Sequence, residues 1–149
     1  MAVRRGGAVD DGTVAERRNR RRRVVMLVQG TYYILTGLWP LAHFSSFSRA
    51  VALSVNPFQA QASGAVLVVI GAYLLEAGRR EPPGASATLL GIAIAGAIAV
   101  VDLVWLPRLA APSALWGDLL AEVAIATALV IFYPRLQAER SSRPPPRRR

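Results

Sequence analysis

The sequence predicts an all-α membrane protein: a four-transmembrane-helix bundle with both termini in the cytoplasm and disordered Arg-rich tails. Three observations predict it. Four apolar stretches follow one another within only 149 residues. More than half of the residues are apolar, yet the formal net charge is +9, so the charge is confined to particular segments. These segments are the two tails and one connection between stretches, which is the pattern of a chain that alternates between bilayer and water.

The chain divides into one transmembrane domain, residues 24–134, between two basic tails, residues 1–23 and 135–149. Both tails are polar and rich in Arg, so we expect them to be disordered. A helix needs about 20 mostly apolar residues to cross about 30 Å of hydrocarbon. All four stretches come close to this length, and we expect the spans at about residues 24–41, 60–77, 85–106 and 114–133.

Helix-ending residues mark the boundaries of the four stretches. Pro40 marks the expected end of the first stretch. Asn56–Pro57, ahead of the second stretch, is typical of a helix cap followed by Pro in the first turn. The third stretch lies between Gly84 and Pro107, and the fourth ends before Pro134.

The connection over residues 42–55 is longer than a turn requires. Phe44, Phe47, Val51 and Val55 recur in it at helical spacing, with serines on the other faces. This pattern is typical of a short amphipathic helix that lies along the outer surface. A loop that covers the mouth of the bundle fits the sequence equally well.

The placement of Arg sets the orientation. All eighteen basic residues are Arg, and sixteen of them lie in the two tails or at Arg79–Arg80. The other two connections hold one each, Arg49 and Arg108. Because cytoplasmic connections carry the excess of Arg, both termini are predicted in the cytoplasm. The aromatic residues agree, since an interfacial belt is formed by Trp39, Trp105 and Trp116 at outer helix ends and by Tyr73 and Tyr133 near inner ends.

The sequence excludes several kinds of chemistry. It has no Cys, which removes disulfides, thiolate nucleophiles, iron–sulfur ligation and c-type haem attachment. Its one His, His43, excludes bis-histidine haem and histidine-rich zinc sites within a single chain. We find no nucleophile–base pair, no metal-ligand spacing and no phosphate-cradling loop. The sequence therefore predicts no catalytic, cofactor-binding or metal residue, and it favours a non-enzymatic protein.

Acidic residues inside the spans form the candidate polar cluster. Asp102 and Asp118 each lie four residues from the outer end of their helix, about 6 Å inside the boundary. Glu122 is one turn deeper on the same face as Asp118. If the third and fourth spans are antiparallel neighbours, the three carboxyls lie at one level, with His43 as the fourth member of the cluster. Carboxyls in a membrane usually face the bundle interior or a partner charge.

Two interpretations of this cluster are open. It is a proton-, cation- or substrate-binding site that opens to the outside, or it is structural, with Arg49, Arg108 or His43 pairing with the carboxyls that water does not reach. Tyr32 and Tyr33, in the first span, add hydroxyls that need buried partners. Glu122 or Gln29 is an expected partner of one of them.

Two further features concern partners. The run from Arg17 to Arg23 abuts the first span, and its candidate contacts with anionic lipid are Arg20, Arg21, Arg22 and Arg23; fixing the topology is the alternative role. Nucleic acid is not an expected partner, because the Arg residues lie on tails without a folded basic face. Gly30 and Gly37 are seven residues apart, as are Gly64 and Gly71, so each pair lies on one helix face. Such faces pack helices within a chain or between two copies of it.

The segment Gly37-Leu38-Trp39-Pro40-Leu41-x-His43, followed by Ser46-Phe47 and a Gly-rich second span, resembles a family of small four-helix bacterial inner-membrane proteins without an assigned function. The resemblance covers residues 30–133 and implies a multi-pass protein of the bacterial cytoplasmic membrane. The chain departs from the family where a Lys-x-Asp-Trp-type segment precedes the second helix, since that place holds residues 56–61, which carry no charge. By size and helix count the chain also resembles DoxX-like membrane subunits, some of which associate with quinone-linked oxidoreductases.

Two classes of function follow from these features. The sequence favours a non-enzymatic accessory or scaffold component that packs against lipid, other membrane proteins or a second copy of itself. The alternative is a small carrier or a quinone-linked membrane enzyme subunit that uses the acidic cluster of the outer leaflet. A carrier of this size has to oligomerise to build a path, because the chain has no convincing internal repeat.

Overall fold

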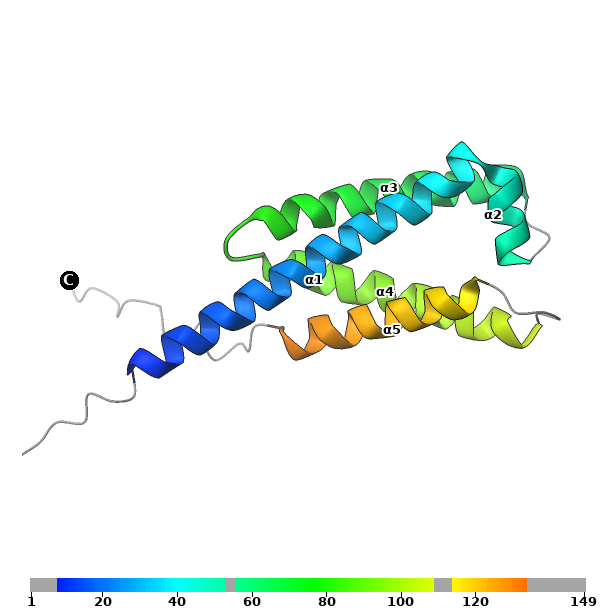
Figure 1. Ribbon diagram of the computed structural model, residues 1–149. Coiled ribbons are helices and arrows are strands. Elements are labelled where there is room, and N and C mark those ends of the chain that lie inside the picture. Colours follow the sequence, from blue (N-terminus) through cyan, green and yellow to red (C-terminus); the bar gives the residue numbers. More distant parts are fainter. Residues whose placement is uncertain (1–7, 53–55, 109–113, 134–149) are drawn as a thin grey trace, which may run out of the picture.

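The computed structural model describes residues 8–52, 56–108 and 114–133, and these residues are helical almost throughout, with no strand among them (Figure 1). The elements in chain order are α1 (Ala8–Ala42), α2 (Phe44–Val51), α3 (Pro57–Arg79), α4 (Ala85–Trp105), the 3₁₀ turn η1 (Leu106–Arg108) and α5 (Leu115–Ile131). The predicted all-α class is confirmed.

Three helical segments are long and apolar enough to cross a membrane. They are Thr13–Ala42, Pro57–Arg79 and Ala85–Arg108. They correspond to the first three predicted spans, and they support the prediction of a membrane protein. The fourth predicted span corresponds to α5. This helix has 17 residues and is not one of the three segments.

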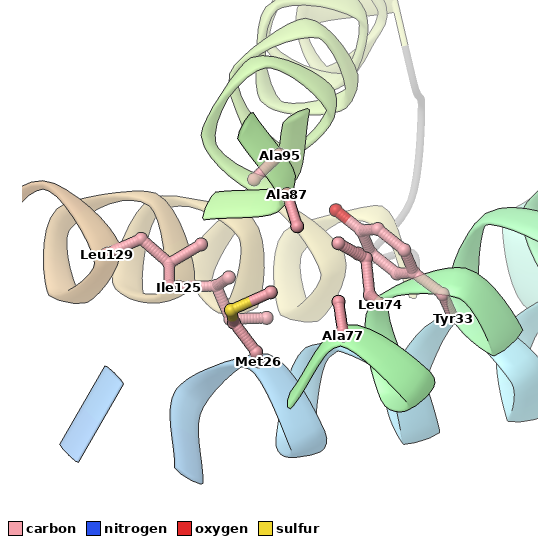
Figure 2. Packing of buried hydrophobic residues seen from close by; sticks show 8 residues of the cluster. All are labelled: Met26, Tyr33, Leu74, Ala77, Ala87, Ala95, Ile125 and Leu129. Atoms are coloured by element: carbon pink, nitrogen blue, oxygen red, sulfur yellow. The ribbon is translucent and has the colours of Figure 1, made fainter. Parts of the chain in front are cut away.

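The long helices form two antiparallel pairs, α1 with α3 and α4 with α5 (Figure 1). The first pair is joined to the second mainly where α1 meets α5, whereas α3 and α4 share few contacts. The buried core lies among all four helices (Figure 2). Its members are Met26, Tyr33, Leu74, Ala77, Ala87, Ala95, Ile125 and Leu129.

The α1–α3 pair is held backbone against backbone by two pairs of glycines. A Cβ on Gly30 would lie 2.7 Å from the carbonyl oxygen of Gly71, and one on Gly37 would lie 2.5 Å from that of Gly64. A side chain larger than hydrogen therefore does not fit at these contacts. Close approach increases van der Waals contact between helices, which is how membrane helices pack without a hydrophobic driving force. Of the two expectations for these glycines, packing within the chain is confirmed.

The structure differs from the sequence-based prediction at both ends of the first helix. The N-terminal tail was expected to be disordered through residue 23, but α1 begins at Ala8. Residues 8–23 extend a helix that the apolar span has already nucleated, and lengthening a helix costs far less than starting one. Pro40 was the expected end, yet α1 continues through it to Ala42. A Pro at this position removes only the one hydrogen bond that its own N–H would have donated to the preceding turn. The C-terminal tail, residues 135–149, lies outside the described residues.

A short helix, α2, follows the C-terminal end of α1, so a helix rather than a loop forms in this connection. The backbone N–H of Ser46 donates to Nδ1 of His43, the N-cap of α2, at 3.3 Å. The indole N–H of Trp39 donates to Ser46 Oγ at 2.8 Å, and the rings of Trp39 and Phe47 meet edge to face. The predicted cap of α3 is also confirmed, since Asn56 Oδ1 accepts from two backbone N–H groups of the first turn.

Candidate functional site

Two adjacent tyrosines of α1 reach two acids on one face of α5. The Tyr33 hydroxyl donates to Glu122 Oε2 at 2.8 Å, and the Tyr32 hydroxyl donates to Asp118 Oδ1. Because Asp118 and Glu122 are four residues apart on a helix, both carboxyls face the same neighbour. These contacts join the α1–α3 pair to the α4–α5 pair.

Gln29 lies one turn before Tyr33 on α1 and connects this arrangement to α4. Its Nε2 donates to the Tyr33 hydroxyl at 3.0 Å and to the carbonyl oxygen of Gly91 in α4 at 2.9 Å. A hydrogen-bonded chain therefore runs from α4 through Gln29 and Tyr33 to Glu122. Glycine at position 91 makes this possible, since a Cβ there would lie 2.7 Å from Gln29 Oε1.

The third acid of the predicted cluster also lies here. Asp102 of α4 is only 5% exposed and lies close enough to Asp118 for their carboxyls to interact. Its Oδ2 is buried without a hydrogen-bond partner among the described residues. Glu122 is 1% exposed. The structure thus brings Asp102, Asp118 and Glu122 into one region of the bundle.

The basic residues that were predicted to pair with the acids contact other groups in the structure. Arg49 donates to the carbonyl oxygen of Ser45, and Arg108 donates to that of Val104 while lying over the Trp105 ring. His43, the fourth member of the predicted cluster, is exposed and caps α2. The ion pairs found among the described residues join Arg23 to Glu81, and Arg79 and Arg80 to Glu76. These lie at the other end of the bundle from Asp102 and Asp118.

A cleft of about 730 Å³ opens between the two helix pairs at the level of these acids. We call it the acidic cleft; its walls include Asp118, Glu122, Val66, Leu67, Ile94 and Ile98. Most of its lining is apolar, and Phe47 of α2 and Asn56, the N-cap of α3, also line it. Val66 is more than half exposed, so the cleft opens to the surface of the bundle beside α3. Its volume is within the range of small-molecule sites.

Within the described parts of the chain, no group of three His, Asp or Glu side chains lies close enough to hold a metal ion. Two of the three carboxyls already accept a hydrogen bond from a tyrosine hydroxyl. The arrangement can present oriented carboxyl oxygens to a ligand inside a largely apolar space.

At the end of the bundle where α3 ends and α4 begins, the four candidate lipid-contacting arginines separate into two groups. Arg22 is 3% exposed and donates to the carbonyl oxygen of Pro83 at 2.7 Å, and Arg23 pairs with Glu81. Arg20 and Arg21 are exposed and line a hollow of about 600 Å³ together with Phe132. The guanidinium of Arg21 lies 5.9 Å from the centre of the Phe132 ring.

The aromatic residues of the predicted interfacial belt are all at least partly exposed. Trp39 lies in the last turn of α1, Trp105 ends α4, and Trp116 lies in the first turn of α5. These three helix ends lie on the same side of the bundle (Figure 1). Tyr73 and Tyr133 lie nearer the opposite end.

Sequence reasoning identified the acids, both tyrosines and Gln29, but it missed the apolar walls of the cleft. Val66 and Ile98 face the cleft, whereas Val69 of α3 is 70% exposed and does not line it. Residues facing lipid and residues facing an apolar cleft have the same composition, so no sequence signal separates them.

No family model matches this chain, and comparisons with curated proteins and with solved structures also gave no match. The resemblance of the segment from Gly37 to His43 to small inner-membrane proteins therefore stays a prediction.

Proposed function

We propose that this chain is a four-span protein of the bacterial cytoplasmic membrane that acts without catalysis, by binding a lipid-soluble molecule in the acidic cleft. The observation that carries the proposal is the cleft itself: about 730 Å³ of mostly apolar space with Asp118 and Glu122 on its wall. Sites for small molecules combine an apolar lining with a few polar groups in this way.

The fourth span is part of the proposal. The 17 residues of α5 extend about 26 Å, which is near the thickness of the hydrocarbon core. The helix packs along α4, so a bilayer that surrounds α4 surrounds α5 as well. The excess of Arg then favours cytoplasmic positions for both termini and for the α3–α4 connection.

Of the two functional classes that the sequence left open, the cleft favours the one that uses the acidic cluster. A scaffold that acts only through its outer surface has no need of a cleft, and buried acids are costly to retain in a membrane. A small carrier, or a subunit that holds a ligand for a partner, uses both features.

The test is native mass spectrometry of the full chain released from lipid nanodiscs. Val66→Trp places an indole at the mouth of the cleft, and Val69→Trp places one on the same helix outside it. We expect the wild type and Val69→Trp to retain a lipid-soluble molecule that Val66→Trp loses. Equal retention by both variants, or a wild type that carries only bulk lipid, would contradict the proposal.

A further inference from the structure

We propose that the hollow beside Phe132 holds one acidic phospholipid, with its phosphate group among three arginines and one acyl chain along the apolar floor. We call it the basic hollow; it measures about 600 Å³, and its lining residues are Arg17, Arg20, Arg21, Val24, Val25 and Phe132. Phe132 follows the last turn of α5, whereas Asp118 lies in the first turn of that helix. The basic hollow is therefore at the opposite end of α5 from Asp118, and the proposal is independent of the acidic cleft.

The three arginines share one face of α1. Arg17, Arg20 and Arg21 lie at positions i, i+3 and i+4, which neighbour one another on a helix surface, and all three are exposed. The rest of the basic run faces other groups, since Arg22 donates to the carbonyl oxygen of Pro83 and Arg23 pairs with Glu81. The arginines that are available to a lipid thus differ from the four that the sequence suggested, and they include Arg17.

The positive charge of the basic hollow is not balanced by the described residues. The ion pairs found among them involve Arg23, Arg79 and Arg80, but none of the three arginines that line the hollow. Glu16 lines a different hollow, together with Arg23 and Glu81. Like charges one turn apart repel each other, so an anion that enters the hollow relieves this repulsion.

The neighbouring Arg22 adds to the excess of positive charge. It is 3% exposed, and its Nε and Nη1 are buried without a hydrogen-bond partner among the described residues. The summed field of nearby arginines attracts anions to the surface that they share. A phosphate group suits this surface, because several guanidinium groups can donate to its oxygens at once.

The apolar floor favours a lipid over a water-soluble phosphate. Val24 and Val25 begin the apolar part of α1, and Val24 is 52% exposed. The Phe132 ring faces the guanidinium of Arg21 at 5.9 Å on one side of the hollow. The lining therefore changes from charged to apolar within about one helical turn, as a phospholipid changes from phosphate to acyl chain. In a membrane helix such a change lies at the level of the headgroups.

Titration of the full chain in neutral detergent, followed by native mass spectrometry, tests the site. The probes are phosphatidylglycerol, phosphatidylcholine with the same acyl chains, and glycerophosphoglycerol, which is the first lipid without its chains. We expect one phosphatidylglycerol to bind with saturation and more tightly than phosphatidylcholine. Glycerophosphoglycerol at equal concentration should not displace it, because it makes no contact with the apolar floor.

Two double variants remove equal charge from the same end of the bundle. Arg17→Gln combined with Arg20→Gln should weaken binding of phosphatidylglycerol about fivefold for each arginine removed. Arg79→Gln combined with Arg80→Gln should leave it unchanged, since these arginines lie near Glu76 and do not line the hollow. Phe132→Ala should weaken it about fivefold by removing part of the floor, whereas Phe58→Ala, at the exposed start of α3, should not.

Equal losses in the two double variants would overturn the site, because affinity would then follow total charge. Displacement by glycerophosphoglycerol would identify a site for a water-soluble phosphate ester, and equal binding of phosphatidylcholine would show that the arginines do not select the ligand; either result overturns the acidic lipid. Elution volume and thermal unfolding check that each variant folds. Should Phe132→Ala misfold, the double variants decide, since the arginines that they replace are exposed.

Discussion

Gly37 of α1 and Gly64 of α3 contact each other through their backbones: a Cβ built on either one would lie 2.5 Å from the carbonyl oxygen of the other. The obstructing atoms belong to main chain, which cannot rotate away as a side chain can. Gly30 and Gly71 repeat the contact two turns along the helix pair. The separation of α1 and α3 is therefore set by residues that have no side chain.

Gly37→Ala should destabilise the folded bundle, because α1 and α3 have to move apart to admit the methyl group. Overpacking of this kind costs about 1–3 kcal/mol. Gly96 of α4 has nothing within 4 Å of its Cβ position, so Gly96→Ala should be neutral or stabilising, by up to about 1 kcal/mol. Reversible unfolding in mixed detergent micelles measures both variants. Equal stability of the two would show that the helix pair tolerates a wider separation.

Tyr33→Phe should destabilise the bundle as well, by leaving two buried groups unsatisfied. The hydroxyl accepts from Gln29 and donates to Glu122, so its removal costs about 1–3 kcal/mol. Tyr73→Phe is the matched control, since Tyr73 is half-exposed on α3 and its hydroxyl is not part of this buried chain. The same unfolding measurement compares them. A Tyr33→Phe variant as stable as Tyr73→Phe would mean that water replaces the lost hydroxyl.

The features that the sequence predicts correctly are local or periodic. Asn56 caps α3 by accepting from N–H groups no more than three residues away. Gly30 and Gly37 are seven residues apart, so they lie on one face of their helix whichever helix packs against it. The contacts of Tyr33 with Glu122 and Gln29 were also predicted, because polar groups buried in a membrane need polar partners. The contact of Tyr32 with Asp118 was not predicted.

What the sequence does not reveal depends on how elements pack. Arg22 reads as one more solvated charge of the tail, yet it is buried against Pro83 because α1 extends past the apolar span. The acidic cleft exists because α3 and α4 share few contacts, and no residue pattern records the separation of two helices. His43 was predicted to lie beside the acids because of its expected depth in the membrane. In the structure it is the N-cap of α2 instead.

Arg21→Gln should weaken binding of anionic lipid more than Arg23→Gln. Arg21 is exposed and lines the hollow beside Phe132, whereas Arg23 is already paired with Glu81. One Arg near the surface contributes about 1 kcal/mol toward anionic lipid, or roughly fivefold in affinity. Native mass spectrometry with mixed neutral and anionic lipids measures the occupancy. Equal loss in the two variants would assign the effect to total charge rather than to this hollow.

Reporter fusions after Gly84 and at the C-terminus should report the cytoplasm, and fusions near Ser48 and Ala111 should report the outside. Two separate features favour this result: sixteen of eighteen Arg residues lie in the two tails and at Arg79–Arg80, and α5 packs along α4 with the opposite direction (Figure 1). Ala111 and the C-terminus lie outside the described residues, so their sides of the membrane depend on whether α5 spans. The decisive fusion is the C-terminal one. If α5 spans, the C-terminus returns to the cytoplasm; if only three helices span, it stays outside, and the four-span proposal fails.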